Sequence, residues 1–246
     1  MHCVPHDSIL PPLARMVLLV LSSVVLWRCT EETPRMGNYE VEGIDVSHYQ
    51  SLIDWEAVRD AGFAFAFVKA TEGQDHADTL FCRNWDEMKR VGILRGAYHF
   101  YRPEVPALVQ AENFLLQVEL EAGDLPPVLD VEVRGEMPDE IFWHEVFCWL
   151  AVVEHRTGKR PILYTYQKFF NEHLHPRFAD YPLWIARYNR WLRPSLKGRK
   201  QWLFWQYGDK GRVEGIDAWV DFNVFAGNLR QLQELCLGKS PGISQL

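Results

Sequence analysis

The sequence contains few of the features that mark metal sites, nucleotide sites or nucleic-acid binding. Its 246 residues include only five cysteines, without a CxxC pair or a Cys/His spacing typical of zinc. It has neither a glycine-rich phosphate loop nor a serine nucleophile elbow. The net charge of −7 argues against general nucleic-acid binding, which depends on clustered Lys and Arg. We therefore expect no metal, no cofactor and no nucleic-acid partner.

Long apolar runs are also scarce. The run at residues 16–27 is shorter than a typical transmembrane helix, which needs about 20 residues. Its length matches the apolar region of a secretory signal. Cys29 follows this run and suggests a lipid-anchored form, although the preceding Leu26, Trp27 and Arg28 fit lipoprotein processing poorly. An uncleaved anchor that tethers the chain to the membrane is the alternative. We interpret residues 1–29 as a signal peptide or lipoprotein-like leader and residues 30–40 as a linker.

Outside the leader, three widely spaced cysteines remain, namely Cys82, Cys148 and Cys236. We expect three buried thiols, with a single disulfide as the alternative. Aromatic residues, by contrast, are abundant at 13%. They are typical of a well-packed core, and alternatively of a cleft lined with rings that stack on sugars.

Short apolar segments alternate with helical patterns through most of the chain. Strands are predicted at residues 43–47, 63–70, 94–101, 127–132 and 161–166, and helices at 54–61, 79–90, 106–121 and 139–156. Three looser strands at 182–188, 202–207 and 219–222 then precede a closing helix at 228–237. About five βα units followed by three looser strands predict an α/β fold, a single irregular (β/α)-barrel spanning residues 41–237, with a tail at 238–246.

Two acidic residues end the fourth predicted strand. Asp130 and Glu132 are two residues apart and therefore point to the same side, away from Leu129 and Val131. Repulsion between two close carboxylates raises one pKa and leaves a proton donor beside an ionised partner, as glycosidic bond cleavage requires. The alternatives are solvated surface acids or an ion pair with Arg134.

Two further acids are placed by the first and last strands. Asp45 lies between Ile44 and Val46, so its side chain faces the opposite way from both. Asp221 lies in the last strand, which neighbours the first in a closed eight-stranded barrel. We therefore expect Asp45 and Asp221 to lie side by side, close to the pair on the fourth strand.

Eight motifs occur in the order found in glycoside hydrolase family 25 lysozymes, the N-acetylmuramidases, which the chain resembles over residues 41–230. The motifs are Gly43–Gln50 (GIDVSHYQ), Phe67–Gly73 (FVKATEG), Gly96–Phe100 (GAYHF), Leu129–Glu132 (LDVE), Ile162–Thr165 (ILYT), Leu183–Tyr188 (LWIARY), Trp205–Tyr207 (WQY) and Val220–Asn223 (VDFN). The resemblance implies a flattened barrel that hydrolyses the β-1,4 bond between N-acetylmuramic acid and N-acetylglucosamine in peptidoglycan.

The resemblance also implies a role for each acid. Glu132 would be the general acid, and Asp130 would either attack the anomeric carbon or orient the 2-acetamido group of the substrate. Asp45 and Asp221 would complete the acidic cleft. The aromatic residues of the matching motifs would contact the sugar, Tyr98 and Tyr164 beside the reacting ring and Trp184, Tyr188, Trp205 and Tyr207 as sugar platforms.

Several neighbouring residues have simpler interpretations. We expect Lys69 and Glu72 to form a structural ion pair at the rim, and His48 and His99 to be hydrogen-bonded scaffold residues. Trp191 and Arg193 belong to a loop and are candidates for contact with the peptide stem of the substrate.

Two other functional classes fit the same fold. The first is an inactive peptidoglycan-binding module, although the four acids are intact. The second is a hydrolase of another acetamido-sugar polymer; family 18 chitinases are a poor match, because Leu125 and Val128 occupy two acidic positions of their signature. We expect an exported monomer that acts in the periplasm, cell envelope or extracellular space on peptidoglycan glycan strands.

Overall fold

The computed structural model describes residues 32–198, 201–236 and 238, and the unit considered below begins at Thr33. The predicted leader and nearly all of the predicted tail lie outside the described residues. Within the described part of the chain, no helix is long and apolar enough to cross a membrane.

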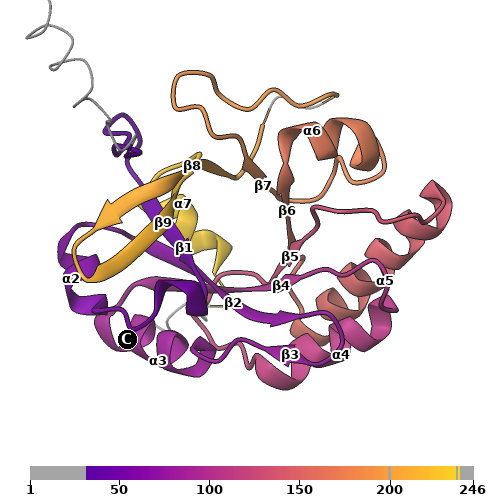
Figure 1. The fold of residues 1–246 in the computed structure, drawn as a ribbon, viewed down its shortest axis with the longest axis horizontal. Helices are drawn as coiled ribbons and strands as arrows, with labels where there is room; N and C mark the ends of the chain where they lie inside the picture. Colours follow the sequence, from indigo (N-terminus) through magenta and orange to yellow (C-terminus); the bar gives the residue numbers. More distant parts are fainter. Residues whose placement is uncertain (1–31, 199–200, 237, 239–246) are drawn as a thin grey trace, which may run out of the picture. The chain divides into compact units, whose positions relative to one another are not determined.

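Eight strands of the described chain close into a barrel (Figure 1). They are β1 (Glu42–Val46), β2 (Phe65–Glu72), β4 (Leu94–Phe100), β5 (Val128–Asp130), β6 (Ile162–Tyr166), β7 (Leu183–Ala186), β8 (Phe204–Val213) and β9 (Ile216–Phe225). The barrel closes because β1 pairs with both β2 and β9, and a short β3 (His76–Ala77) pairs with the end of β2. The predicted fold class is confirmed.

The second half of the barrel differs from a regular βα repeat. Apart from the short β3, the strands from β1 through β8 are parallel to one another, but β9 is antiparallel to both β8 and β1. The two predicted segments at 202–207 and 219–222 are thus parts of one long hairpin that turns near Gly215, whose φ is +91°. The extension was missed because exposed polar residues such as Asp209 and Lys210 carry little apolar pattern, although the backbone pairs with its own hairpin partner.

Helices follow most of the parallel strands. They are α2 (Trp55–Asp60), α3 (Phe81–Val91), α4 (Ala107–Gln117), α5 (Asp139–Thr157), the short α6 (Gln167–Phe169) and α7 (Leu229–Leu235), with a 3₁₀ turn η1 (His48–Gln50) and a π-helical turn η2 (Phe170–Leu174). Asp54 caps α2, because its side chain accepts hydrogen bonds from the backbone of Glu56 and Ala57. Gly92 and Gly158 end α3 and α5 in the left-handed conformation.

Aromatic rings fill the barrel interior. Phe67 stacks on Trp184 with ring centroids 4.4 Å apart, and Phe204 packs at 5.1 Å from both Phe65 and Phe67. A second, larger core lies between the strands and the outer helices and includes Ile44 and other outward-facing strand residues. Packing thus explains most of the aromatic content. Side chains fill the barrel interior except at one end, which is open.

The cysteines form only part of the predicted buried set, because Cys236 is buried but the other two are not. Cys82 is exposed and Cys148 is partly buried, and both are free thiols. Cys82 is exposed because it lies on the solvent side of α3, while Phe81 and Trp85 of the same helix turn toward the core.

Close packing against a ring explains why the first motif begins with glycine. Gly43 pairs in register with Phe65, and a Cβ atom at Gly43 would lie 2.5 Å from the Phe65 ring. Any larger side chain therefore displaces a ring that fills the barrel interior.

We expect Gly43→Ala to lower the free energy of unfolding by about 1–3 kcal/mol, because overpacking forces the Phe65 ring out of place. Chemical denaturation measures this change. Gly37→Ala is the matched control, since a Cβ atom there meets nothing within 4 Å. Equal effects of the two substitutions would contradict this explanation.

Candidate active site

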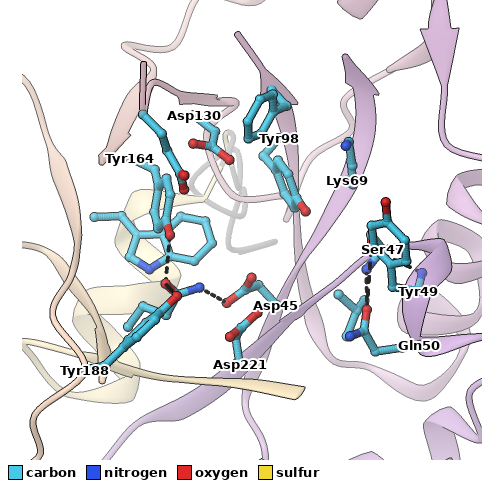
Figure 2. A pocket seen from close by; sticks show the side chains of 15 residues that line it. Asp45, Ser47, Tyr49, Gln50, Lys69, Tyr98, Asp130, Tyr164, Tyr188 and Asp221 are labelled. Carbon is cyan, nitrogen blue, oxygen red and sulfur yellow. Dashed lines mark hydrogen bonds between the residues drawn. The ribbon is translucent and has the colours of Figure 1, made fainter. Parts of the chain in front are cut away.

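A cavity of about 260 Å³ opens at the end of the barrel where the parallel strands finish (Figure 2). All four predicted acids line it: Asp45, Asp130, Glu132 and Asp221. Figure 2 shows Asp45 and Asp221 facing each other, with Asp130 across the cavity from them. The structure therefore brings together acids that are as far apart in the sequence as the first and last strands.

Strand pairing explains how each acid reaches the cavity. Asp130 is the last residue of β5, and Glu132 follows two residues later on the same side. Asp45 and Asp221 are directly opposite each other in the antiparallel pairing of β1 with β9. Because β9 runs in the opposite direction to the other strands, Asp221 lies within its strand rather than at its carboxyl end.

Two amide side chains hold the Asp45 carboxylate. Its Oδ2 atom accepts hydrogen bonds from Nδ2 of Asn223 at 2.7 Å and from Nε2 of Gln206 at 2.9 Å. The Asn223 amide is oriented by Trp184, whose indole Nε1 donates to Oδ1 of Asn223 at 2.8 Å. Because an indole only donates, the amide NH₂ group of Asn223 must face Asp45.

Tyrosine hydroxyls orient the second amide in the same way. Oε1 of Gln206 accepts hydrogen bonds from the hydroxyls of Tyr164, at 2.7 Å, and Tyr188, at 3.2 Å. Its NH₂ group is thereby turned toward Asp45. Gln206 and Asn223 were not singled out from the sequence, although both stand in the quoted motifs. Strand alternation could have identified both residues. The neighbours on either side of each one point into the outer core, so the amide itself must point into the barrel.

Burial dominates the electrostatics of the facing pair. It raises the pKa of Asp45, and the hydrogen bonds from Asn223 and Gln206 oppose this rise. Burial also raises the pKa of Asp221, which the neighbouring charge of Asp45 raises further. The amides favour the ionised form of Asp45, so Asp221 is the member of the pair that holds a proton at neutral pH.

The β5 pair is perturbed in the same direction. Burial raises the pKa of Asp130 well above its ordinary value, and the charges of Glu132 and Asp45 add to this effect. Burial also raises the pKa of Glu132, which remains partly accessible. The buried Oδ1 atom of Asp130 has no hydrogen-bond partner among the described residues. This atom can therefore accept a hydrogen bond from a bound molecule.

The aromatic residues predicted to contact sugar divide into two groups. Tyr98, Tyr164, Trp184 and Tyr188 line the cavity. Trp205 and Tyr207 do not, because they flank Gln206 on β8 and point into the outer core, where each is almost fully buried. The expectation that these two form sugar platforms is wrong: on this strand the inward position belongs to Gln206.

The rim residues have the structural roles expected of them. Nζ of Lys69 lies 2.5 Å from Glu72, which also pairs with Arg102. His99 is buried, with Nδ1 2.7 Å from the Thr71 hydroxyl and Nε2 3.0 Å from Oε1 of Gln110. Burial lowers the pKa of His99 to about 4, so this histidine is neutral scaffold.

His48 has a structural partner of its own. Its Nδ1 atom lies 2.7 Å from Oδ2 of Asp78, and the same carboxylate accepts the backbone N–H of His48. Asp78 thereby ties the turn after β1 to the segment that leads into α3.

Comparison with known proteins identifies relatives across most of the chain. Residues 44–216 match the family model for glycosyl hydrolases family 25. The uncharacterised protein YegX of Escherichia coli O6:H1 is 47% identical over 202 residues, which cover 80% of this chain and 74% of YegX. Lysozyme M1 of Streptomyces globisporus is 35% identical over 208 residues, covering 79% of this chain and 71% of the lysozyme.

Solved structures agree with this assignment. A family 25 glycosyl hydrolase from Bacillus anthracis superposes with a TM-score of 0.78 at 31% identity, covering 85% of this chain and 99% of that one. A bacterial lysozyme from Streptomyces coelicolor superposes with a TM-score of 0.76 at 32% identity, covering 81% and 98%.

We expect Asp221→Asn to stabilise the protein at alkaline pH, by roughly 0.5–2 kcal/mol. The folded state holds a proton on Asp221 at pH values where the unfolded chain, with an aspartate pKa of about 4, has released it. The free energy of unfolding of the wild type therefore falls as pH rises from about 4 through the raised pKa. Asparagine keeps a hydrogen-bond donor beside Asp45 but does not titrate.

Urea denaturation at pH 5 and at pH 8 measures this difference, which should be larger at pH 8. Asp217→Asn is the control, because Asp217 is an exposed acid on the same strand. A stability gain that is the same at both pH values would show that Asp221 is not the group that retains the proton.

Proposed function

The chain belongs to glycosyl hydrolase family 25. From this premise we propose a catalytic role for each of its four acids. The protein is a muramidase, a glycoside hydrolase that acts on the β-1,4 bond between N-acetylmuramic acid and N-acetylglucosamine in bacterial peptidoglycan. The observation that supports the assignment of roles is the convergence of Asp45, Asp130, Glu132 and Asp221 in one cavity.

Glu132 is the general acid. Among the four acids it combines a pKa raised by burial with a position where the cavity meets a second groove along the surface. A protonated carboxyl at that position donates its proton to the glycosidic oxygen as the bond to the anomeric carbon breaks. The same carboxylate then accepts a proton from the water that completes hydrolysis.

Asp130 orients the 2-acetamido group of the muramic acid residue. Its buried Oδ1 atom lacks a donor in the described chain, and the acetamido N–H supplies one next to the anomeric carbon. This hydrogen bond aligns the acetamido oxygen to attack that carbon, so the substrate provides the nucleophile. Direct attack by Asp130 is the alternative, in which the same unpartnered oxygen atom would bond to the anomeric carbon.

Asp45 and Asp221 complete the acidic wall of the cavity, Asp45 as the ionised member of the pair and Asp221 as the member that holds a proton. The Asp45 carboxylate is fixed by two amides before substrate binds, so it stabilises positive charge on the sugar ring without reorganisation. Tyr98, Tyr164, Trp184 and Tyr188 surround the ring. An inactive binding module is the second candidate function, but it would not require four perturbed acids around one cavity.

Action on the cell wall places the substrate outside the cytoplasm. Residues 1–29 serve as the export leader in this proposal, either cleaved or retained as a lipid anchor at Cys29 or as a membrane tether, and residues 30–40 link the leader to a monomeric catalytic barrel at 41–237.

We expect the protein to digest purified peptidoglycan and to leave muramitol at the new ends after borohydride reduction, as identified by mass spectrometry. Glu132→Gln should fold normally and lose about 10²–10⁴-fold in turnover, the usual cost of removing a positioned general acid. Retention on the insoluble polymer without new reducing ends would instead indicate a binding module, and glucosaminitol ends would indicate cleavage of the other bond.

Substrate assistance predicts a steep fall in rate as the acetamido methyl group is fluorinated, because fluorine withdraws electrons from the attacking oxygen. Initial rates on synthetic muramyl oligosaccharides with one, two and three fluorines measure this dependence. Rates that are insensitive to fluorine, together with a glycosyl group bound covalently to Asp130, would establish direct attack.

A further inference from the structure

The segment that follows β7 is strongly basic within an acidic chain. Residues 187–200 contain no Asp or Glu, and their basic residues are Arg187, Arg190, Arg193, Lys197, Arg199 and Lys200. None of the first four forms an ion pair with an acidic residue in the described part of the chain. Arg187, the first of these residues, directly precedes Tyr188, which lines the acidic cavity.

A groove of about 450 Å³ connects this segment to the catalytic cavity. It is lined by the ends of β6 and β7 and the residues that follow them, including Tyr166, Lys168 and Arg187. Glu132, Tyr164 and Tyr188 line both the groove and the cavity. A polymer that occupies the cavity and passes Glu132 therefore enters this groove.

The guanidinium of Arg187 is held in place and retains unused donors. Its Nη1 atom donates to Oε1 of Gln167 at 3.0 Å and to the carbonyl oxygen of Arg193 at 2.9 Å, both neutral acceptors. Across the described ranges, Nε and Nη2 make no hydrogen bond. These two atoms form one edge of the guanidinium, the edge that binds a carboxylate through two parallel hydrogen bonds.

We propose that this groove binds the leaving-group side of the glycan strand and that Arg187 binds a carboxylate of a peptide stem carried by the strand. The inference rests on the proposed function, because it takes Glu132 as the acid that protonates the leaving oxygen. The sugars of peptidoglycan that carry no stem are uncharged, whereas the stems bear carboxylates. An arginine with a fixed position and an unused pair of donors binds a carboxylate of the stem better than it binds a sugar hydroxyl.

The test removes the charge of the stem carboxylates and the charge of Arg187, separately and together, and compares the effects on the rate. Peptidoglycan is digested before and after its stem carboxylates are converted to amides, and kcat/KM is measured for the wild type and for Arg187→Gln. On the untreated polymer, Arg187→Gln should lower kcat/KM roughly 10- to 100-fold, the usual range for losing a charged hydrogen-bonded pair. Amidation should lower the wild type by a similar factor and leave Arg187→Gln little changed.

Two further variants separate this contact from other effects. Arg187→Lys keeps the charge but not the paired donors, and it should fall between the wild type and Arg187→Gln. Arg190→Gln removes a charge from the same segment, but its guanidinium lies over the Trp191 ring at 4.3 Å, outside the groove. It should retain wild-type sensitivity to amidation.

Three outcomes would overturn the proposal. Equal losses in Arg187→Gln and Arg190→Gln that disappear in high salt would indicate general attraction to an anionic wall. A loss in Arg187→Gln that is the same on amidated and untreated polymer would indicate a structural effect on the loop. A wild type that is indifferent to amidation would exclude stem recognition. A wild type inactive on both polymers would instead contradict the proposed function.

Discussion

Burial of acidic side chains in one shared cavity is the constraint around which this protein is arranged. Burial opposes ionisation of Asp45, Asp130 and Asp221, and each ionised neighbour makes the next ionisation harder. Two oriented amides favour one charge, that of Asp45, so protons are retained elsewhere in the cavity. Burial, which reduces stability at high pH by opposing ionisation of these acids, also raises the pKa of Glu132, so the cost in stability and the supply of a proton donor have the same physical cause.

The barrel supplies the rigidity that this arrangement requires. The closely packed rings of Phe67, Trp184 and Phe204 fill its interior below the acids, and Trp184 also donates to Asn223, which holds Asp45. One ring therefore belongs both to the packed core and to the hydrogen-bond network of the site. Closure of β1 onto the antiparallel β9 then brings Asp45 and Asp221 together. The site depends on packing and on barrel closure at the same time.

Strand alternation was a reliable guide wherever one face of a strand was clearly apolar. It placed Asp45 between outward-facing Ile44 and Val46, and it placed Asp130 and Glu132 on one side. On β8, Trp205 and Tyr207 were assigned to the sugar from the family resemblance, and alternation was not applied to Gln206 between them. There the aromatic side chains face the outer core and the amide faces the cavity. In a barrel with a packed layer on both faces, hydrophobicity alone does not distinguish inside from outside.

The sequence by itself determined the local elements, the βα order and the identity of the four acids, because helix caps, glycine stops and strand periodicity act over a few residues. Only the tertiary structure decided the direction of β9, the amide support of Asp45 and the groove that exposes Arg187. These features depend on contacts between segments far apart in the chain, such as Asp45 with Gln206 and Asn223. Short-range patterns carry no information about such pairings until the barrel closes.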